Sequence, residues 1–363
     1  MQLPNLQTVA QLMTWLEQEK IAYQALAENF ASQPIPLVEK PGTGGKPVII
    51  TAGAHTSEPA GVFAALQLMR EVDLPNPVVF VPLRDPFGWQ GVELCLAHVL
   101  GERPQIGTHE DLEQLLLSDR AQPLNHEKDF VVSEINGVVF VSLRLPPRPV
   151  GPRQVEQRVN RLLSERPELV ARLRGKRLVF PANSGEAEGV GNFYRAFTAI
   201  VNPAGLVADM NRGFGAAGQV VEVSCLRALV DELQPGLVLD LHEGQGSSFY
   251  FFVPGYGECP ETRRFADLAA AAVTSAGTRL LSLDDLAAAL GARVRESLAE
   301  PAPGIFTGRV EQTGRTGGSS FGAYCARFAP SLTFESGRWA PLEQRIARHL
   351  TAARSILRTY ASG

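Results

Sequence analysis

The chain has 363 residues, of which 45% are hydrophobic and 20% are charged, and its formal net charge is −4. This composition is typical of a globular enzyme and excludes a mainly disordered or fibrous chain. The balance of 34 basic against 38 acidic residues disfavours nucleic acid as a partner. No run of about eighteen apolar residues predicts a membrane span, and the N-terminus lacks the basic start of a secretory signal. We therefore expect a cytoplasmic protein with no membrane partner.

The four cysteines lie far apart in the sequence, at Cys95, Cys225, Cys259 and Cys325. Because they form no C-x-x-C pair, they indicate neither a disulfide framework nor a thiolate metal site. A reducing compartment is the simpler expectation.

The first part of the chain alternates helices and short apolar strands. Helical spacing of apolar residues predicts a helix over 7–19, and a turn-rich stretch follows over 34–46. Residues 47–52 predict a buried strand, residues 59–69 a helix and residues 78–82 the next strand. This order indicates a βαβ unit. We expect an α/β fold with a mixed, largely parallel sheet sandwiched by helices.

The middle of the chain departs from this pattern. Two β-rich runs, 130–135 and 138–143, are joined by Asn136-Gly137, which is a strong hairpin signal. We therefore expect an inserted antiparallel piece here. A helical stretch over 153–173, restarted at its internal proline, and a strand at 178–181 follow it.

Basic residues are in excess between Arg144 and Arg177, where ten Lys or Arg accompany three Glu. This excess could attract an acidic substrate. It could also belong to a solvated helix face, which is the commoner situation.

The α/β pattern resumes in the last third of the chain. We expect helices over 221–233, 261–275 and 341–360, and strands over 237–241, 248–253 and 332–334.

Three polar motifs stand at or directly after the ends of predicted apolar strands, where open α/β sheets place their sites. They are His55-Thr-Ser-Glu58, Asp240-Leu-His242-Glu243 and Thr333-Phe-Glu335-Ser336. Alternation along a strand puts Asp240 and His242 on one side, so the carboxylate can orient the imidazole. Two His and one Glu beside a further carboxylate are the ligand set of a catalytic zinc with an open position. The motifs therefore predict hydrolysis, with zinc polarising a carbonyl and a free carboxylate taking a proton.

Together with Asp209-Met-Asn211-Arg212, these motifs resemble the zinc carboxypeptidase superfamily, including its deacylase branch of succinylglutamate desuccinylases and aspartoacylases. The four motifs follow the family's order and span residues 47–340. The resemblance implies one zinc ion held by His55, Glu58 and His242, with Glu335 as the general base.

The resemblance also implies roles for residues around the metal. Asn211 and Arg212 would clamp a substrate carboxylate, for which a guanidinium offers a planar fork. Asp209 would hold His55 in place. The family's oxyanion-stabilising arginine corresponds most closely to Arg195, since it lies upstream of the D-x-N-R motif. Tyr324 is open to two readings, the family's mobile aromatic acid or a packing residue, and packing is the commoner role.

One long segment departs from the family. Between Trp89 and Gly191 peptidase members commonly have a much shorter connection, so we expect residues 90–190 to be an insertion that serves as a lid, a specificity wall or an oligomer contact. The short stretch after Glu335 resembles the end of the single-domain peptidases. We therefore expect one domain over residues 1–363.

Three functions remain open from the sequence. The leading one is a zinc hydrolase that cleaves an amide next to a carboxylate-bearing residue, as a carboxypeptidase does. The alternative is a deacylase of N-acyl amino acids, and the third is a non-catalytic relative that binds ligands. Because all the expected ligands and Glu335 are present, we favour an enzyme whose partner is a peptide or small molecule with a free carboxylate.

Overall fold

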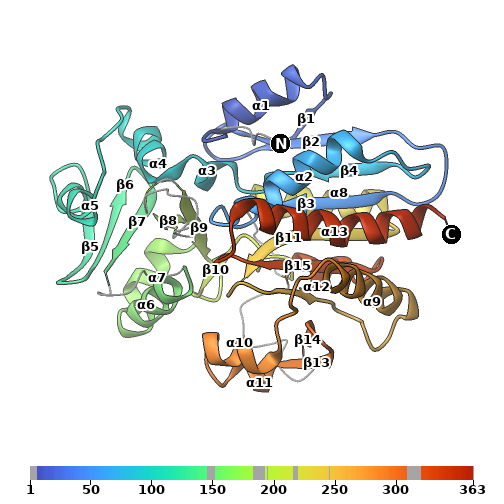
Figure 1. Cartoon of the computed structure of the whole chain (residues 1–363). Coiled ribbons are helices and arrows are strands. Elements are labelled where there is room, and N and C mark those ends of the chain that lie inside the picture. Colours follow the sequence, from blue (N-terminus) through green and yellow to red (C-terminus); the bar gives the residue numbers. More distant parts are fainter. Residues whose placement is uncertain are drawn as a thin grey trace.

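The computed structural model describes residues 6–144, 152–182, 193, 195–215, 220–244, 246–308 and 320–362. These residues form two β-sheets, and helices pack against both sheets (Figure 1). Parts of the expected insertion, residues 145–151 and 183–190, lie outside this description. Within the described ranges, no helix combines the length and the apolar character that crossing a membrane requires.

The larger sheet has nine strands and mixed directions. Its centre is parallel, from β4 through β3 and β11 to β15, whereas β2 and β12 add antiparallel neighbours on either side. The mixed α/β fold expected from the sequence is therefore confirmed. In spatial order the strands are β1 (Gln24–Glu28), β2 (Pro34–Lys40), β4 (Val78–Val81), β3 (Val48–Ala52), β11 (Leu237–Gly244), β15 (Ser331–Gly337), β12 (Phe249–Phe252), β14 (Ile305–Gly308) and β13 (Leu298–Ala302).

Helices cover both faces of this sheet because its central strands are apolar on both sides. Neighbouring residues of β3 separate the two cores, since Ile50 and Ile49 point to opposite faces. The core with Ile50 includes α1 (Val9–Gln18), α2 (Pro59–Glu71), α9 (Pro260–Ser275) and α13 (Leu342–Ala361). The core with Ile49 includes α8 (Val221–Leu233) and α12 (Phe321–Cys325). A smaller cluster joins α10 (Leu283–Leu290) and α11 (Val294–Ser297) to the edge beyond β12.

The second sheet has six strands and its own helices. In spatial order the strands are β10 (Val207–Asp209), β9 (Ala196–Val201), β8 (Arg177–Pro181), β7 (Val138–Leu143), β6 (Phe130–Ile135) and β5 (Gln122–Glu127). One face packs on α3 (Pro86–Trp89), α4 (Gly91–Leu100) and α5 (His109–Leu116), and the other on α6 (Pro152–Glu165) and α7 (Pro167–Leu173). The predicted hairpin joins β6 to β7, with positive φ at Asn136 and Gly137. The sheet extends to Asp209, so it carries the start of the D-x-N-R motif.

One local prediction was wrong. Residues 34–40, expected as part of a turn-rich stretch, form strand β2, in which Ile35, Leu37 and Val38 are buried. The prolines Pro34 and Pro36 suggested a break because proline cannot donate to a strand ladder. The buried apolar residues outweigh that loss, and the pairing between β1 and β2 contains a register shift.

Candidate metal centre

The ends of three parallel strands bring the predicted site residues together. Strands β3, β11 and β15 are neighbours, and His242 of β11 lies in register with Glu335 of β15. Since parallel strands end at the same sheet edge, the segment after β3 reaches this place too. That segment carries His55, and Glu58 follows at the residue before α2.

A glycine lets α2 approach the sheet closely. A Cβ on Gly61 would lie 2.4 Å from the carbonyl oxygen of Leu241, which is closer than real Cβ atoms come. Only glycine therefore allows the first turn of α2 to rest on β11. This contact sets the distance between Glu58, at the start of the helix, and His242, on the strand.

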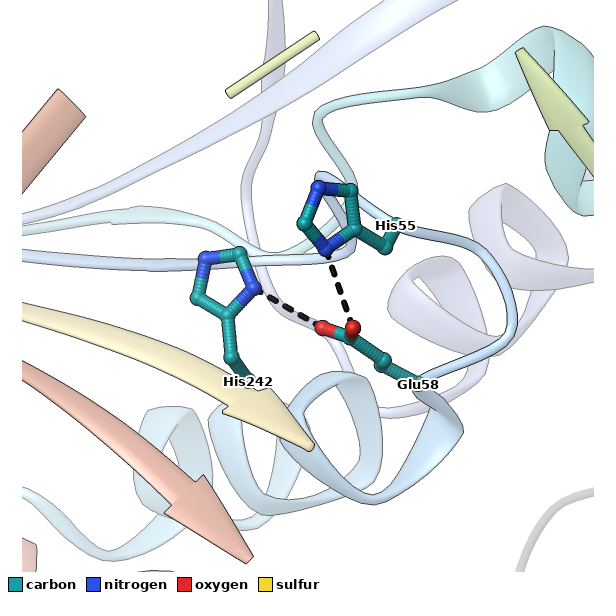
Figure 2. A group of neighbouring side chains, drawn as sticks. All are labelled: His55, Glu58 and His242. Atoms are coloured by element: carbon teal, nitrogen blue, oxygen red, sulfur yellow. Dashed lines mark hydrogen bonds and ion pairs between the residues drawn. The ribbon is translucent and has the colours of Figure 1, made fainter. Parts of the chain in front are cut away.

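His55, Glu58 and His242 form a compact cluster (Figure 2). Nδ1 of His55 lies 2.9 Å from Oε1 of Glu58, and Nδ1 of His242 lies 2.8 Å from Oε2 of the same carboxylate. One nitrogen from each imidazole and one carboxylate oxygen all lie within 4.8 Å of one another. Two imidazoles and a carboxylate at this spacing are a donor set suited to a transition metal such as zinc.

A further carboxylate lies on the far side of each imidazole. Oδ2 of Asp240 lies 2.9 Å from Nε2 of His242, and Oδ1 of Asp209 lies 3.4 Å from Nε2 of His55. Such partners hold the ring orientation and favour a proton on Nε2, which leaves Nδ1 free to bind a metal. The two Nδ1 atoms thus converge on Glu58 while the two Nε2 atoms face carboxylates.

In the absence of a metal, the imidazoles and carboxylates of the cluster stabilise each other's charged forms. Burial lowers the pKa of His55, but Glu58 and Asp209 outweigh burial and raise this pKa to about 9. Burial likewise opposes protonation of His242, yet Asp240 and Glu58 raise its pKa well above the usual value. The pKa of Glu58 is lowered, because the two imidazoles outweigh the effect of burial. Both imidazoles are therefore protonated at neutral pH in the metal-free protein, where they face three carboxylates.

Glu335 stands beside the cluster and titrates differently. Burial raises the pKa of this carboxyl to about 7, and the nearby Glu58 also raises it, whereas His242 and His55 act in the opposite direction. A carboxyl with a pKa near neutrality can both accept and release a proton under working conditions. The two glutamates of the site thus have pKa values displaced in opposite directions.

Arg84 is a residue of this region that the sequence reasoning missed. Its Nη1 donates to Asp240 at 3.2 Å, its Nη2 donates to Asn211 at 3.3 Å, and its guanidinium lies over the rings of Phe214 and Phe321. Arg84 comes shortly after the apolar strand β4, the same position after a strand that singled out His55. That signal could have found it.

The D-x-N-R motif reaches the same region from the second sheet. Asp209 ends β10, and Oδ1 of Asp209 accepts a 2.7 Å hydrogen bond from the backbone N–H of Asn211. Asn211 is buried, and its side-chain oxygen also accepts from the N–H of Phe321. The Arg212 side chain is partly exposed, and its guanidinium makes no hydrogen bond or ion pair within the described ranges. Its positive charge acts on the carboxyl groups of Asp209 and Glu156, whose pKa values it lowers.

The second sheet also contributes Glu156, which the sequence reasoning did not single out. This residue lies on α6, one helical turn before Asn160, whose side chain accepts a 2.7 Å hydrogen bond from the N–H of Val207. Burial raises the pKa of Glu156 to about 8, and Asp209 adds to the increase while His55 and Arg212 oppose it. Part of the predicted insertion therefore borders the metal centre.

Arg195, expected to stabilise an oxyanion, directs its guanidinium to backbone carbonyl groups. Its guanidinium is buried, donates to the carbonyl oxygens of Leu6 at 2.8 Å and Trp89 at 2.7 Å, and stacks 3.6 Å from the centre of a Trp89 ring. These donors serve the backbone, so this placement does not support the predicted role. Local sequence could not reveal this, because the carbonyl acceptors come from distant parts of the chain.

Tyr324 packs away from the cluster. Its ring lies in the core with α8, near Phe214 and Phe328, and its hydroxyl donates to Asp231. These contacts agree with the packing role, the commoner of the two considered.

Comparisons with known proteins find similarity only among solved structures. No protein-family model matches the chain, and no curated protein matches it. A candidate metallopeptidase from Shewanella amazonensis SB2B is 15% identical, with 98% of this chain and 93% of that chain covered and a TM-score of 0.48. A second, from Shewanella denitrificans OS217, is 14% identical over 97% and 88% of the two chains, with a TM-score of 0.49.

A metallo-carboxypeptidase from Burkholderia cenocepacia is 13% identical, with 97% of this chain and 69% of that chain covered and a TM-score of 0.48. The chain is thus similar to metallopeptidases and metallocarboxypeptidases over nearly its whole length. The likeness concerns the general fold, and the roles of individual residues rest on the geometry described above.

Proposed function

We propose that this protein is a zinc-dependent hydrolase that cleaves an amide bond next to a carboxylate-bearing residue, as metallocarboxypeptidases do. One observation carries the proposal. The Nδ1 atoms of His55 and His242 converge on Glu58, while Glu335 stands in register beside His242 with no place in that cluster of donors. A bound metal and a separate carboxyl that accepts protons are the two parts that this kind of hydrolysis needs.

The donor set fits a zinc ion. His55, Glu58 and His242 would hold it, and Asp209 and Asp240 would keep both imidazoles turned toward it. When bound, zinc would polarise the scissile carbonyl and acidify water. Three protein ligands leave room for a substrate, which favours a catalytic over a structural site.

Glu335 would move the proton. As its carboxylate it accepts a proton from the attacking water, and as its acid it returns that proton to the leaving nitrogen. A pKa of about 7, raised mainly by burial, suits both halves of this cycle near neutral pH. The role as base is consistent with the position of Glu335 at the end of β15, outside the three donors.

Arg212 and Asn211 would bind the substrate carboxylate. The Arg212 guanidinium has no hydrogen-bond partner among the described residues. The side-chain oxygen of Asn211 accepts from Arg84 and from the N–H of Phe321, which fixes the orientation of its amide group. A carboxylate held by a planar fork aligns the amide bond with the metal, and such alignment is a large part of many rate enhancements.

A substrate panel tests the proposal. The panel contains dipeptides, tripeptides and N-acyl amino acids, each with a free and with an amidated terminal carboxylate. Purified protein is assayed on each substrate before chelation, after chelation and after zinc is restored. We expect hydrolysis of free-carboxylate substrates that chelator abolishes and zinc restores. Preference between peptides and N-acyl amino acids then separates a carboxypeptidase from a deacylase. Hydrolysis that is indifferent to chelator, or none at all, contradicts the proposal.

A further inference from the structure

We propose that Arg338, rather than Arg195, donates the hydrogen bond that stabilises the negative charge on the substrate's carbonyl oxygen. This inference rests on the proposed function. Arg338 belongs to none of the sequence motifs described above and comes three residues after Glu335.

Arg338 lies against the metal centre. Its Nη2 is 3.8 Å from Oε1 of Glu58 and donates to the backbone carbonyl of Glu243 at 3.4 Å. Glu243 directly follows His242, so the guanidinium lies at the end of β11 and next to Glu58. The side chain is only 14% exposed. A largely buried cation is therefore held beside Glu58, one of the three proposed zinc ligands.

The backbone around Arg338 is shaped for this position. Gly337 ends β15, and a Cβ there would lie 2.5 Å from the carbonyl oxygen of Gly246 and 2.6 Å from that of Ser248. Only glycine permits so close a passage. The N–H of Arg338 then donates to the carbonyl of Gly244 at 3.1 Å, which ties the residue to the end of β11. The chain thus stays in β15 to Gly337 and turns at Arg338, which is held next to the end of β11.

The donors of Arg338 are only partly used. Its Nε is buried without a hydrogen-bond partner among the residues that the structure describes. The 3.8 Å separation from Glu58 exceeds a hydrogen bond, and the imidazoles already contact both oxygens of that carboxylate. A buried guanidinium with unmade hydrogen bonds is unfavourable unless a ligand completes them. An oxyanion beside Glu58 would do so.

The neighbouring arginines are already committed. Arg195 donates to the backbone of Leu6 and Trp89, and Arg84 is enclosed by Asp240, Asn211 and two aromatic rings. To reach the carbonyl oxygen, either would have to abandon buried partners. Arg338 needs no such exchange.

The test compares the variants Arg338→Ala and Arg338→Lys with the matched control Arg348→Ala. Arg348 lies on α13 and donates a 2.6 Å hydrogen bond to the carbonyl oxygen of Ser247, which the control removes. Kinetics use a substrate from the panel. Binding uses a phosphinate isostere of a dipeptide with a free terminal carboxylate, whose tetrahedral anion resembles the charged carbonyl, and titration calorimetry gives its affinity for the zinc-loaded protein. Bound zinc is counted for each variant.

We expect Arg338→Ala to lower kcat by about 10²–10³-fold and to weaken phosphinate binding by a similar factor, with KM and bound zinc nearly unchanged. Arg338→Lys should lie between, because it keeps the charge without the fork. Added guanidinium should restore part of the activity of Arg338→Ala, and Arg348→Ala should behave as wild type.

Wild-type kcat and phosphinate affinity in Arg338→Ala, with Glu335→Gln inactive, would overturn this inference and leave the proposed function standing. Loss of zinc from Arg338→Lys would also overturn it, since Arg338 would then support Glu58 instead of the substrate. If the wild type hydrolyses no substrate, the proposed function fails. Phosphinate binding decides the inference separately: if wild type and Arg338→Ala bind the phosphinate equally, or if neither binds it, the role of Arg338 is overturned.

Discussion

In the six-stranded sheet, Glu134 of β6 pairs with Arg172 at 3.0 Å and with Lys176, and all three side chains reach solvent. In the nine-stranded sheet, Asp240 and His242 of β11 pair at 2.9 Å with almost no exposure. Exposed ion pairs contribute at most about 1 kcal/mol, whereas removing a charge from water costs several kcal/mol. The exposed pairs of the six-stranded sheet thus add a little stability at low cost. The buried pair of the nine-stranded sheet costs free energy of folding, so its presence points to a function.

Replacing one glutamate in each sheet should give the largest difference in turnover between the functional and the stabilising carboxylates. Glu335→Gln should lower turnover by about 10²–10⁴-fold, because the amide cannot accept a proton, while the zinc content stays at the wild-type level. Glu134→Gln is the matched control and should leave turnover unchanged. Steady-state kinetics with zinc analysis measures both. Near-native turnover of Glu335→Gln would refute the mechanism.

Zinc affinity should depend steeply on pH. Carboxylates raise the pKa of His55 to about 9, and that of His242 is raised too, so both imidazoles are protonated in the metal-free protein at pH 7 and must lose a proton to bind zinc. Affinity should therefore rise by about 10²-fold from pH 7 to pH 8, one factor of ten for each proton. Competition with a chelator at several pH values measures this.

The same titration with His109→Ala, on helix α5 beside the second sheet, should show the same slope, because the pKa of His109 is lowered by burial and this imidazole is not in the cluster. His242→Ala should bind little zinc at any pH. An affinity that does not change with pH would contradict the protonation of the two imidazoles described for the cluster.

Arg212→Lys tests the carboxylate clamp. It keeps the charge but loses the planar fork, so kcat/KM should fall by about 10–100-fold for substrates with a free carboxylate. Amidated substrates should be cleaved poorly by wild type and variant alike, since amidation of the substrate and the Arg212→Lys change remove the same guanidinium–carboxylate interaction. Arg158→Lys, which alters an ion pair with Glu127 on the second sheet, is the control. Equal cleavage of free and amidated substrates by the wild type would exclude the clamp.

A buried imidazole near the site should make stability sensitive to acid. His349 of α13 is fully buried near Phe249 and Phe334, and burial, with His242 and Arg345, lowers its pKa to about 3. The unfolded chain binds a proton here near pH 6.5 and the folded chain does not, so acid favours unfolding. Relative to His349→Leu, the metal-free wild type should lose about 2 kcal/mol of unfolding free energy between pH 6.5 and pH 5. Denaturant titrations at both pH values measure this, and parallel pH dependences would contradict it.

The smallest effect should come from the surface pairs of the six-stranded sheet. Removing the carboxylate in Glu134→Gln should lower the free energy of unfolding by less than about 1 kcal/mol, because Arg172 and Lys176 remain partly in water. The difference should shrink as salt is added. A larger, salt-independent loss would mean that this pair behaves like the buried pairs of the other sheet.

Much of the fold was predictable because local patterns decide it. The apolar runs of β3, β11 and β15 fill buried strands, and Asn136-Gly137 forms the hairpin turn. The positions of His55, His242 and Glu335 also follow from sequence, since residues at the ends of parallel strands gather at one sheet edge. The strands and the turn depend on neighbours within a few residues, and the end of each strand marks where its polar residues lie.

The tertiary structure alone decided which other charges share that edge. Glu156 comes from helix α6, which packs on the second sheet, and Arg338 comes from a turn that Gly337 allows to pass beside Gly246. The same long-range packing directs Arg195 to the backbone at Leu6 and Trp89. Periodicity and motif spacing specify how a segment folds and where its polar residues lie along the chain. The direction of a long side chain depends on acceptors that distant segments supply, and only the assembled structure brings those acceptors into place.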